Sequence, residues 1–123
     1  MNPRGRPGSD PAGRPLVSDP VERVLAALNA QDVEAFVACY APDATIEDGA
    51  DTVRVRGHGE LRATYGAMFG RQPGIQVEAV HRTDTGPYVV QEERVTGRSP
   101  VPERHVAVYT LRDGLIARER LLR

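Results

Sequence analysis

The chain has 123 residues, of which 40% are apolar, which suits one domain with a single modest core. Its 16 basic side chains nearly balance its 17 acidic ones, so no net field favours nucleic acid or an anionic membrane. No apolar segment approaches the roughly 20 residues that cross a bilayer, and the first residues lack the apolar centre of a signal peptide. We therefore expect a cytoplasmic protein without membrane or nucleic-acid partners.

Cysteine and histidine usage limits the chemistry further. Cys39 is the one cysteine of the sequence, which excludes an internal disulfide and a cysteine-based zinc cluster. The three histidines are scattered without paired spacing, so we expect no metal site. The sequence also contains no glycine-rich phosphate loop, and we expect no cofactor.

The chain begins with a segment that differs in composition from the rest. Residues 1–18 are rich in proline, glycine and arginine and poor in apolar side chains, which predicts a disordered tail. The folded domain then covers residues 19–123. The run Ser18-Asp19-Pro20 is typical of a helix start, because a capping side chain precedes a proline in the first turn. The apolar stripe that follows predicts a first helix ending near Ala30.

The stretch DVEAFVACYAPDATIED predicts a second helix, a proline-marked turn and a short strand. Pro42 is expected to end the helix, because the residue before a proline avoids the helical region, and this places Tyr40 on the helix. A strand alternates its faces, so Asp48 points the same way as Ile46. A carboxylate aimed at an apolar interior is costly unless it has a task, so Asp48 is the first candidate base. The alternative is a surface acid at a strand end.

The remaining elements change from helix to strand along the chain. Residues 53–56 predict a short strand, residues 57–59 a break and residues 60–69 a third helix. Four later segments are rich in valine and β-branched residues and are separated by turn residues, which predicts strands at 75–82, 88–96, 104–111 and 115–122. This order predicts an α+β domain in which one mostly antiparallel sheet curls around three helices.

This layout resembles the nuclear transport factor 2-like superfamily, which includes ketosteroid isomerases, SnoaL-like polyketide cyclases and the limonene-epoxide-hydrolase group. The likeness covers roughly residues 21–123 and is carried by DVEAFVACYAPDATIED, RGHGELRATY and VYTLRDGLIARERLL. It implies a cone-shaped barrel formed by a curved sheet wrapped around the N-terminal helices. Membership alone does not define an activity, because one fold hosts many functions.

The resemblance assigns roles to several positions. Asp48 falls where ketosteroid isomerases keep the carboxylate that moves a proton between carbons, and Tyr40 and Tyr65 fall where they keep two networked tyrosines. The two groups that stabilise the enolate would be Val24 and Ala107, neither of which can donate a hydrogen bond. Losing both donors removes about 3–4 kcal/mol of stabilisation each, which argues against a true ketosteroid isomerase.

The epoxide-hydrolase pattern is also incomplete. Those enzymes use an Arg-x-Asp pair and a second aspartate on the last strand. The corresponding positions are Arg94 and Thr96, with Leu121 on the last strand, so only the arginine remains. Epoxide opening is therefore the less favoured chemistry.

The strand at 104–111 has two distinct faces. His105 and Ala107 share one face, which the resemblance places inside the cone, and Val106 and Val108 share the other. The second face would pack against another subunit, so we expect a homodimer. His105 could serve as an acid–base partner or a substrate donor, or it could be a solvated or structurally paired histidine.

The strand at 88–96 leaves an alternative open. One reading places Gln91 and Glu93 inside the cavity, and the epoxide-hydrolase comparison places Arg94 inside instead, because a single bulge exchanges the two faces. Glu119 on the last strand points inward in the first reading, although the alternating charges around it are also typical of a solvated strand.

Together these observations predict a cofactor-free enzyme for isomerisation, cyclisation or epoxide opening of an apolar polyketide- or terpenoid-like small molecule. Asp48 would be the base, with Tyr65 and His105 as its catalytic partners. The side chains expected to bind the substrate are Tyr40, Glu93, Val24, Ala107 and Glu119. The alternative is a non-catalytic ligand-binding or dimerisation module of the same fold.

Overall fold

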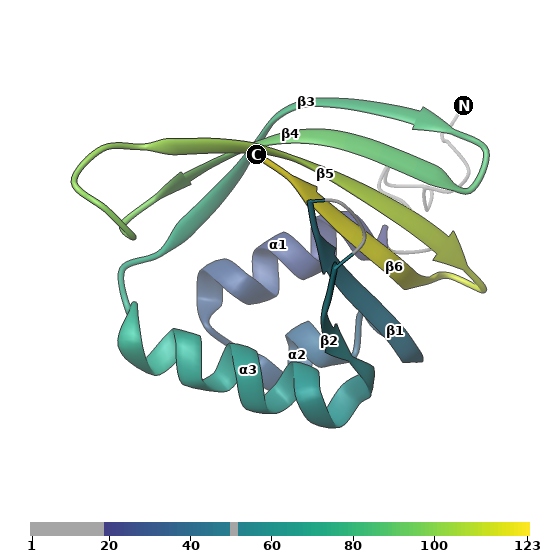
Figure 1. Cartoon of the computed structure of the whole chain (residues 1–123), viewed down its shortest axis with the longest axis horizontal. Coiled ribbons are helices and arrows are strands. Elements are labelled where there is room, and N and C mark those ends of the chain that lie inside the picture. Colours follow the sequence, from purple (N-terminus) through teal and green to yellow (C-terminus); the bar gives the residue numbers. More distant parts are fainter. Residues whose placement is uncertain (1–18, 50–51) are drawn as a thin grey trace, which may run out of the picture.

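A curved sheet of six strands covers three helices in the computed structural model, which describes residues 19–49 and 52–123 (Figure 1). The predicted tail at residues 1–18 lies outside the described residues. The helices are α1 (Pro20–Ala30), α2 (Val33–Val37) and α3 (Gly57–Arg71). The strands are β1 (Tyr40–Asp48), β2 (Thr52–Arg56), β3 (Gln76–Thr85), β4 (Tyr88–Thr96), β5 (Glu103–Arg112) and β6 (Leu115–Leu122).

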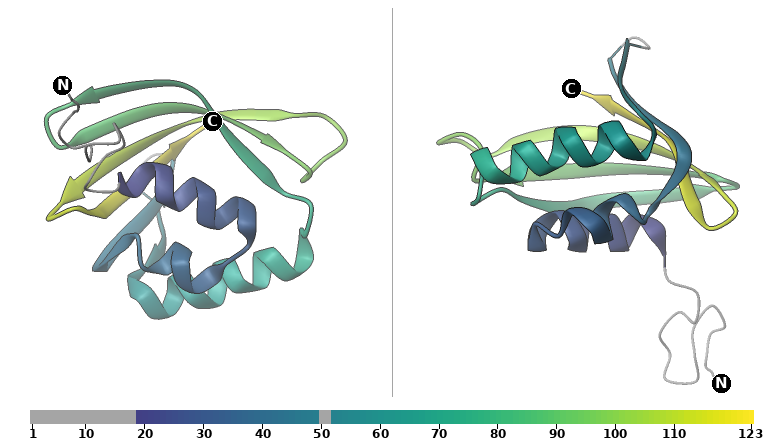
Figure 2. Two further views of the ribbon diagram at one scale, coloured as in Figure 1. Left: turned by 180° about the vertical axis from the view of Figure 1, so that it is seen from behind. Right: turned by 90° about the horizontal axis from the view of Figure 1, so that it is seen from below.

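The strands follow the order β2-β1-β6-β5-β4-β3, so the sheet has two free edges and does not close. Neighbouring strands are antiparallel except β1 and β6, which run parallel. All three helices lie on the concave side of the sheet, as two further views show (Figure 2). The expected α+β class, with a sheet wrapped around N-terminal helices, is confirmed. None of the described helices is long and apolar enough to cross a membrane.

The first helix starts as its sequence predicts. Asp19 caps α1 by accepting a hydrogen bond of 3.0 Å from the backbone N–H of Val21, and Pro20 occupies the first turn. The carboxylate of Asp19 also pairs with Arg82 on β3, which ties the start of the helix to the sheet.

The second helix is shorter than predicted. It ends at Val37, and β1 already begins at Tyr40, before Pro42. The pairing between β1 and β6 shifts register between Tyr40 and Thr45. Pro42 therefore lies in an irregular part of the strand, where its missing N–H breaks no ladder hydrogen bond. The prediction of Tyr40 on a helix was wrong, and this tyrosine instead projects from a strand.

The predicted break at residues 57–59 forms the first turn of α3. Gly57 has φ of +79°, which allows the sharp turn from β2 into the helix. His58 in that turn contacts the backbone oxygen of Tyr40 at 2.8 Å, so the start of α3 is anchored to β1. The glycines therefore make a tight connection here instead of a loop.

The open question about the 88–96 strand is resolved by its pairing. Gln91 lies opposite Ala107 and Glu93 opposite His105, and no bulge interrupts the β4–β5 ladder. Gln91 and Glu93 are buried on the concave face, whereas Arg94 lies outside and pairs with Glu78 at 3.5 Å. The irregularity in this region belongs to β3, between residues 79 and 81. The first reading is therefore the correct one.

Candidate active site

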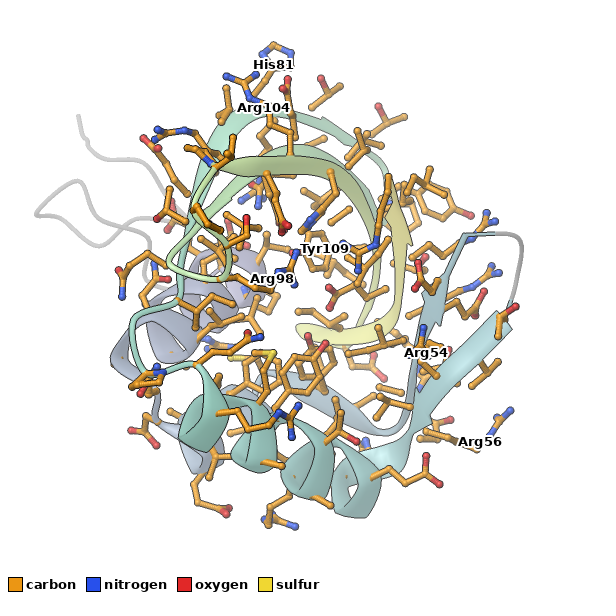
Figure 3. All side chains as sticks on the ribbon, turned by 60° about the vertical axis from the view of Figure 1, so that its left-hand side comes forward. Arg54, Arg56, His81, Arg98, Arg104 and Tyr109 are labelled. Atoms are coloured by element: carbon orange, nitrogen blue, oxygen red, sulfur yellow. The ribbon has the colours of Figure 1, made fainter. Side chains whose placement is uncertain are left out.

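A cavity of about 220 Å³ lies between the concave face of the sheet and the helices. Its wall is largely apolar and aromatic, and Val24, Phe36 and Ile46 contribute from α1, α2 and β1. Figure 3 looks toward this hollow: Tyr109 and Arg98 lie toward it, whereas His81 and Arg104 project from the outer face of the sheet. Six of the predicted site residues that line it are polar: Tyr40, Asp48, Tyr65, Glu93, His105 and Glu119.

Glu93 is held by three neighbouring side chains. Its Oε2 accepts hydrogen bonds from the Tyr109 hydroxyl at 2.5 Å and from Gln91 Nε2 at 2.8 Å. Its Oε1 lies 2.8 Å from Nε2 of His105. The side chain is only 3% exposed. Three side chains on two strands therefore fix the position of this buried carboxyl group.

Glu119 is buried in a poorer environment. Its Oε1 accepts one hydrogen bond of 2.5 Å from the Tyr40 hydroxyl, and Oε2 has no partner among the described residues. Burial and the nearby charge of Glu93 raise the pKa of Glu119 to about 8, although the Tyr40 hydrogen bond acts in the opposite direction. This carboxyl group therefore carries a proton near neutral pH. The prediction that Glu119 points inward is confirmed by its burial.

Three tyrosines complete the polar part of the cavity. Burial, reinforced by the nearby charge of Glu119, raises the pKa of Tyr40, Tyr109 and Tyr65. All three phenols therefore remain hydrogen-bond donors at neutral pH. The hydroxyl of Tyr65 meets no partner in the described part of the chain, which leaves it available to a ligand. Its ring packs on Phe36 with ring centroids 4.5 Å apart.

His105 belongs to this network. Its side chain is 8% exposed, and its Nε2 faces Glu93. The other ring nitrogen, Nδ1, is buried without a hydrogen-bond partner among the described residues. A carboxylate oxygen accepts hydrogen bonds, which assigns Nε2 of His105 as the donor in its contact with Glu93. The structure thus combines two of the readings left open for this histidine, since it lines the cavity and is also paired.

Asp48 occupies a different part of the cavity wall. Its Oδ2 lies 2.9 Å from Arg54 on β2 and its Oδ1 lies 3.6 Å from Arg123. The side chain is 28% exposed. Asp48 therefore lines the cavity together with Ile46, as the alternation of the strand predicts, but its surroundings are charged and partly solvated instead of apolar.

Val24 and Ala107, the two predicted positions that lack a hydrogen-bond donor, lie in different surroundings. Val24 lines the cavity, while Ala107 is fully buried in the core and lies outside the described lining. The expectation that Ala107 contacts the substrate is therefore not supported by its position in the core. Neither position supplies a hydrogen bond to a ligand.

Four side chains that hold the site were not among the predicted site residues. Tyr109 and Gln91 hold Glu93, and Arg54 and Arg123 hold Asp48. Strand alternation places Tyr109 on the face of His105 and Gln91 on the face of Glu93, but it assigns them no role. The arginines gave no signal, because their partners come from other strands. Within residues 19–49 and 52–123, no group of three or more His, Cys, Asp or Glu side chains is arranged to hold a metal ion.

The SnoaL-like domain family matches residues 21–119, so the chain belongs to this family. An uncharacterized cystatin-fold protein from Novosphingobium aromaticivorans is 30% identical, with a TM-score of 0.77 over 85% of this chain and 95% of that one. A "putative polyketide cyclase" from Sinorhizobium meliloti is 27% identical, with a TM-score of 0.74 over 85% of this chain and 94% of that one. These likenesses confirm the expected nuclear transport factor 2-like superfamily.

A curated relative supports the same assignment over a shorter stretch. The Steroid Delta-isomerase of Nocardioides simplex is 38% identical over 60 residues, which is 49% of each chain. The match thus spans about half the length of that relative. An isomerase and a protein described as a cyclase are therefore both among the similar proteins, as expected for an isomerase- and cyclase-type family.

Proposed function

We propose that this chain is a cofactor-free isomerase or cyclase that moves protons on a small apolar molecule bearing a carbonyl or epoxide oxygen. The observation that supports it best is the convergence of polar groups on one largely apolar cavity. Asp48 comes from β1, Glu119 from the neighbouring β6, and the paired Glu93 and His105 from β4 and β5. Such a pocket with a few convergent polar groups is the usual form of a small-molecule site.

Asp48 is the proposed base. Arg54 and Arg123 hold its carboxyl group in place beside the cavity, where an oxygen can accept a proton from a ligand carbon. The electron pair of the broken C–H bond would move onto the ligand's carbonyl oxygen and form an enolate. The proton on Asp48 would then return to a different carbon, so that the atoms balance without a cofactor. Tyr65, with its free hydroxyl, would donate a hydrogen bond to that oxygen.

The size of the cavity limits the substrate. A volume of about 220 Å³ is smaller than the roughly 300–1,000 Å³ of pockets that enclose drug-sized ligands. The cavity therefore suits a compact polyketide- or terpenoid-like ring, and a larger molecule would extend out of its mouth, past partly exposed lining residues such as Arg54 and Arg98.

The test uses a ligand of matching size. We would follow conversion of 3-cyclohexen-1-one to the conjugated 2-cyclohexen-1-one by the absorbance of the product. Asp48→Asn should lower the rate by about 10²–10⁴-fold, because the amide cannot accept the proton. The control is Asp43→Asn on the same strand, since Asp43 is exposed and pairs with Arg112 away from the cavity. Unchanged turnover in Asp48→Asn would remove this residue from the mechanism.

The second candidate is a non-catalytic binding module. It is favoured by Val24 and Ala107, which place no donor where ketosteroid isomerases have two. A wild-type protein that binds cyclohexanone but isomerises 3-cyclohexen-1-one no faster than buffer would establish this alternative.

A further inference from the structure

The two buried glutamates of the cavity face unequal environments. Glu93 is surrounded by three hydrogen-bonding side chains, whereas Glu119 receives one hydrogen bond from Tyr40. The second oxygen of Glu119 borders the cavity and has no partner among the described residues. A buried carboxyl group with one donor and a free oxygen is more stable when protonated, and one with three donors is more stable when ionised.

The strands place the two carboxyl groups on either side of β5. Tyr109 lies between them, since it is paired with Glu119 across the β5–β6 ladder and donates its hydroxyl to Glu93. Their charges repel through a poorly solvated interior, so a single negative charge is favoured over two. The titratable groups that face Glu119 from the neighbouring elements are Tyr40, Tyr65, Glu93, His105 and Tyr109.

The charged groups at the mouth of the cavity do not change which of the two glutamates carries the proton. Asp48 is already paired with Arg54 and Arg123, and Arg98 is paired with Glu103 at 2.5 Å. These arginines therefore have acidic partners of their own at the mouth. In the described interior, Glu119 is paired with a phenol instead of a cation.

We propose that Glu119 is the proton-bearing member of this buried glutamate pair, and that its free oxygen donates a hydrogen bond to a neutral oxygen atom of the bound ligand. Glu93 fixes the positions of Tyr109, Gln91 and His105. Tyr40 orients the Glu119 carboxyl group by bonding its other oxygen. The site thus selects ketones, ethers or epoxides over carboxylates, which the charge on Glu93 repels.

This inference rests on the proposed function only in taking the cavity as the ligand site. It supplies, from β6, the hydrogen-bond donor that Val24 and Ala107 cannot provide. During proton transfer, the ligand oxygen would gain negative charge beside the Glu119 donor, and the O–H bond would be retained throughout. A hydrogen-bond donor fixed beside the ligand oxygen stabilises the transition state, because the negative charge develops on that oxygen.

Infrared spectroscopy tests the protonation. The wild-type protein should show a protonated-carboxyl band near neutral pH that disappears as the pH rises through about 8. Glu119→Gln should lack this band, and Glu92→Gln, a matched change on the outer face, should retain it. Absence of the band at pH 6 in the wild type, or its persistence in Glu119→Gln, would refute the assignment.

Binding of three ligands with the same ring tests the selectivity. Calorimetry at pH 6.5 should show cyclohexanone binding at least tenfold tighter than cyclohexanecarboxylate or cyclohexylammonium, and weakening by tenfold or more at pH 9.5. Glu119→Gln should keep cyclohexanone binding at both pH values, because an amide still donates, and Glu119→Met should lose it. Tightest binding of cyclohexylammonium, or equal cyclohexanone binding by Glu119→Met and the wild type, would show that no neutral oxygen is bound by Glu119.

These measurements need no turnover. If Asp48→Asn leaves isomerisation unchanged, the proposed base fails while the binding results still stand. If the infrared band is absent, the Glu119 assignment fails even when isomerisation is observed.

Discussion

Replacing Glu119 with glutamine should make the fold more stable at high pH. The folded protein raises the pKa of this carboxyl group from 4.5 to about 8, because it is buried near Glu93. Below the lower value both states are protonated, and the full stability is present. As the pH rises toward 8, the unfolded chain loses this proton while the folded chain keeps it, so the free energy of unfolding falls. Glutamine has no proton to lose and avoids this loss.

The size of this loss in the free energy of unfolding follows from the shift in the pKa of Glu119. Each pH unit in this window costs about 1.4 kcal/mol, so the whole shift corresponds to an upper limit of about 5 kcal/mol. That is a large fraction of the roughly 5–15 kcal/mol that stabilises an ordinary domain. The Tyr40 hydroxyl can still donate to the glutamine oxygen, so little is lost in exchange.

Urea unfolding at a series of pH values measures this difference. The free energy of unfolding of the wild type should fall between about pH 5 and pH 8, and the curve of Glu119→Gln should be flatter. Glu47→Gln is the contrasting control: the Arg118 hydrogen bonds lower the pKa of Glu47, so that variant should be destabilised near neutral pH. Parallel curves for the wild type and Glu119→Gln would refute the reasoning.

Three further predictions concern the fold and its assembly. Gly97→Ala should destabilise the protein by more than about 1–3 kcal/mol in urea unfolding, because φ is +83° and the new Cβ would lie 2.0 Å from the Gly74 oxygen; an unchanged midpoint would contradict this. Asp19→Ala should cost about 0.5–2 kcal/mol by thermal unfolding through loss of the α1 cap, and no change would show that the cap is dispensable. Sedimentation should detect a homodimer that Val90→Arg dissociates, since Val90 is 41% exposed opposite Val108 on the outer sheet face; a wild-type monomer would exclude that interface.

Local sequence signals predict the strands and the first helix well. The 88–96 and 115–122 segments match β4 and β6, because alternation and turn residues mark both ends. The errors occur where tertiary pairing overrides local preference. Pro42 was expected to end a helix, yet β1 passes through it because the β1–β6 ladder is interrupted there. The glycine at residue 57 was expected to break structure, and it instead starts α3.

The candidate site was predictable in outline but not in its electrostatics. Strand alternation correctly brings Asp48, His105 and Glu119 toward the cavity. It cannot show that Arg54 on β2 pairs with Asp48, because Arg54 lies at a register shift between β1 and β2 that local sequence does not reveal. It also cannot show that Glu93 receives three hydrogen bonds and Glu119 one, although this inequality decides which of them carries the proton.

The position of β6 has a consequence for biosynthesis. This strand is the last of the domain, yet it lies in the middle of the sheet between β1 and β5. Tyr40 and Glu119, which form a hydrogen bond between the neighbouring strands β1 and β6, are 79 positions apart in the chain. A nascent chain on the ribosome therefore holds β1 and β5 without their shared neighbour until translation of the domain is almost finished. During that time the backbone groups on their facing edges lack strand partners and are open to chaperones or to other unfinished chains.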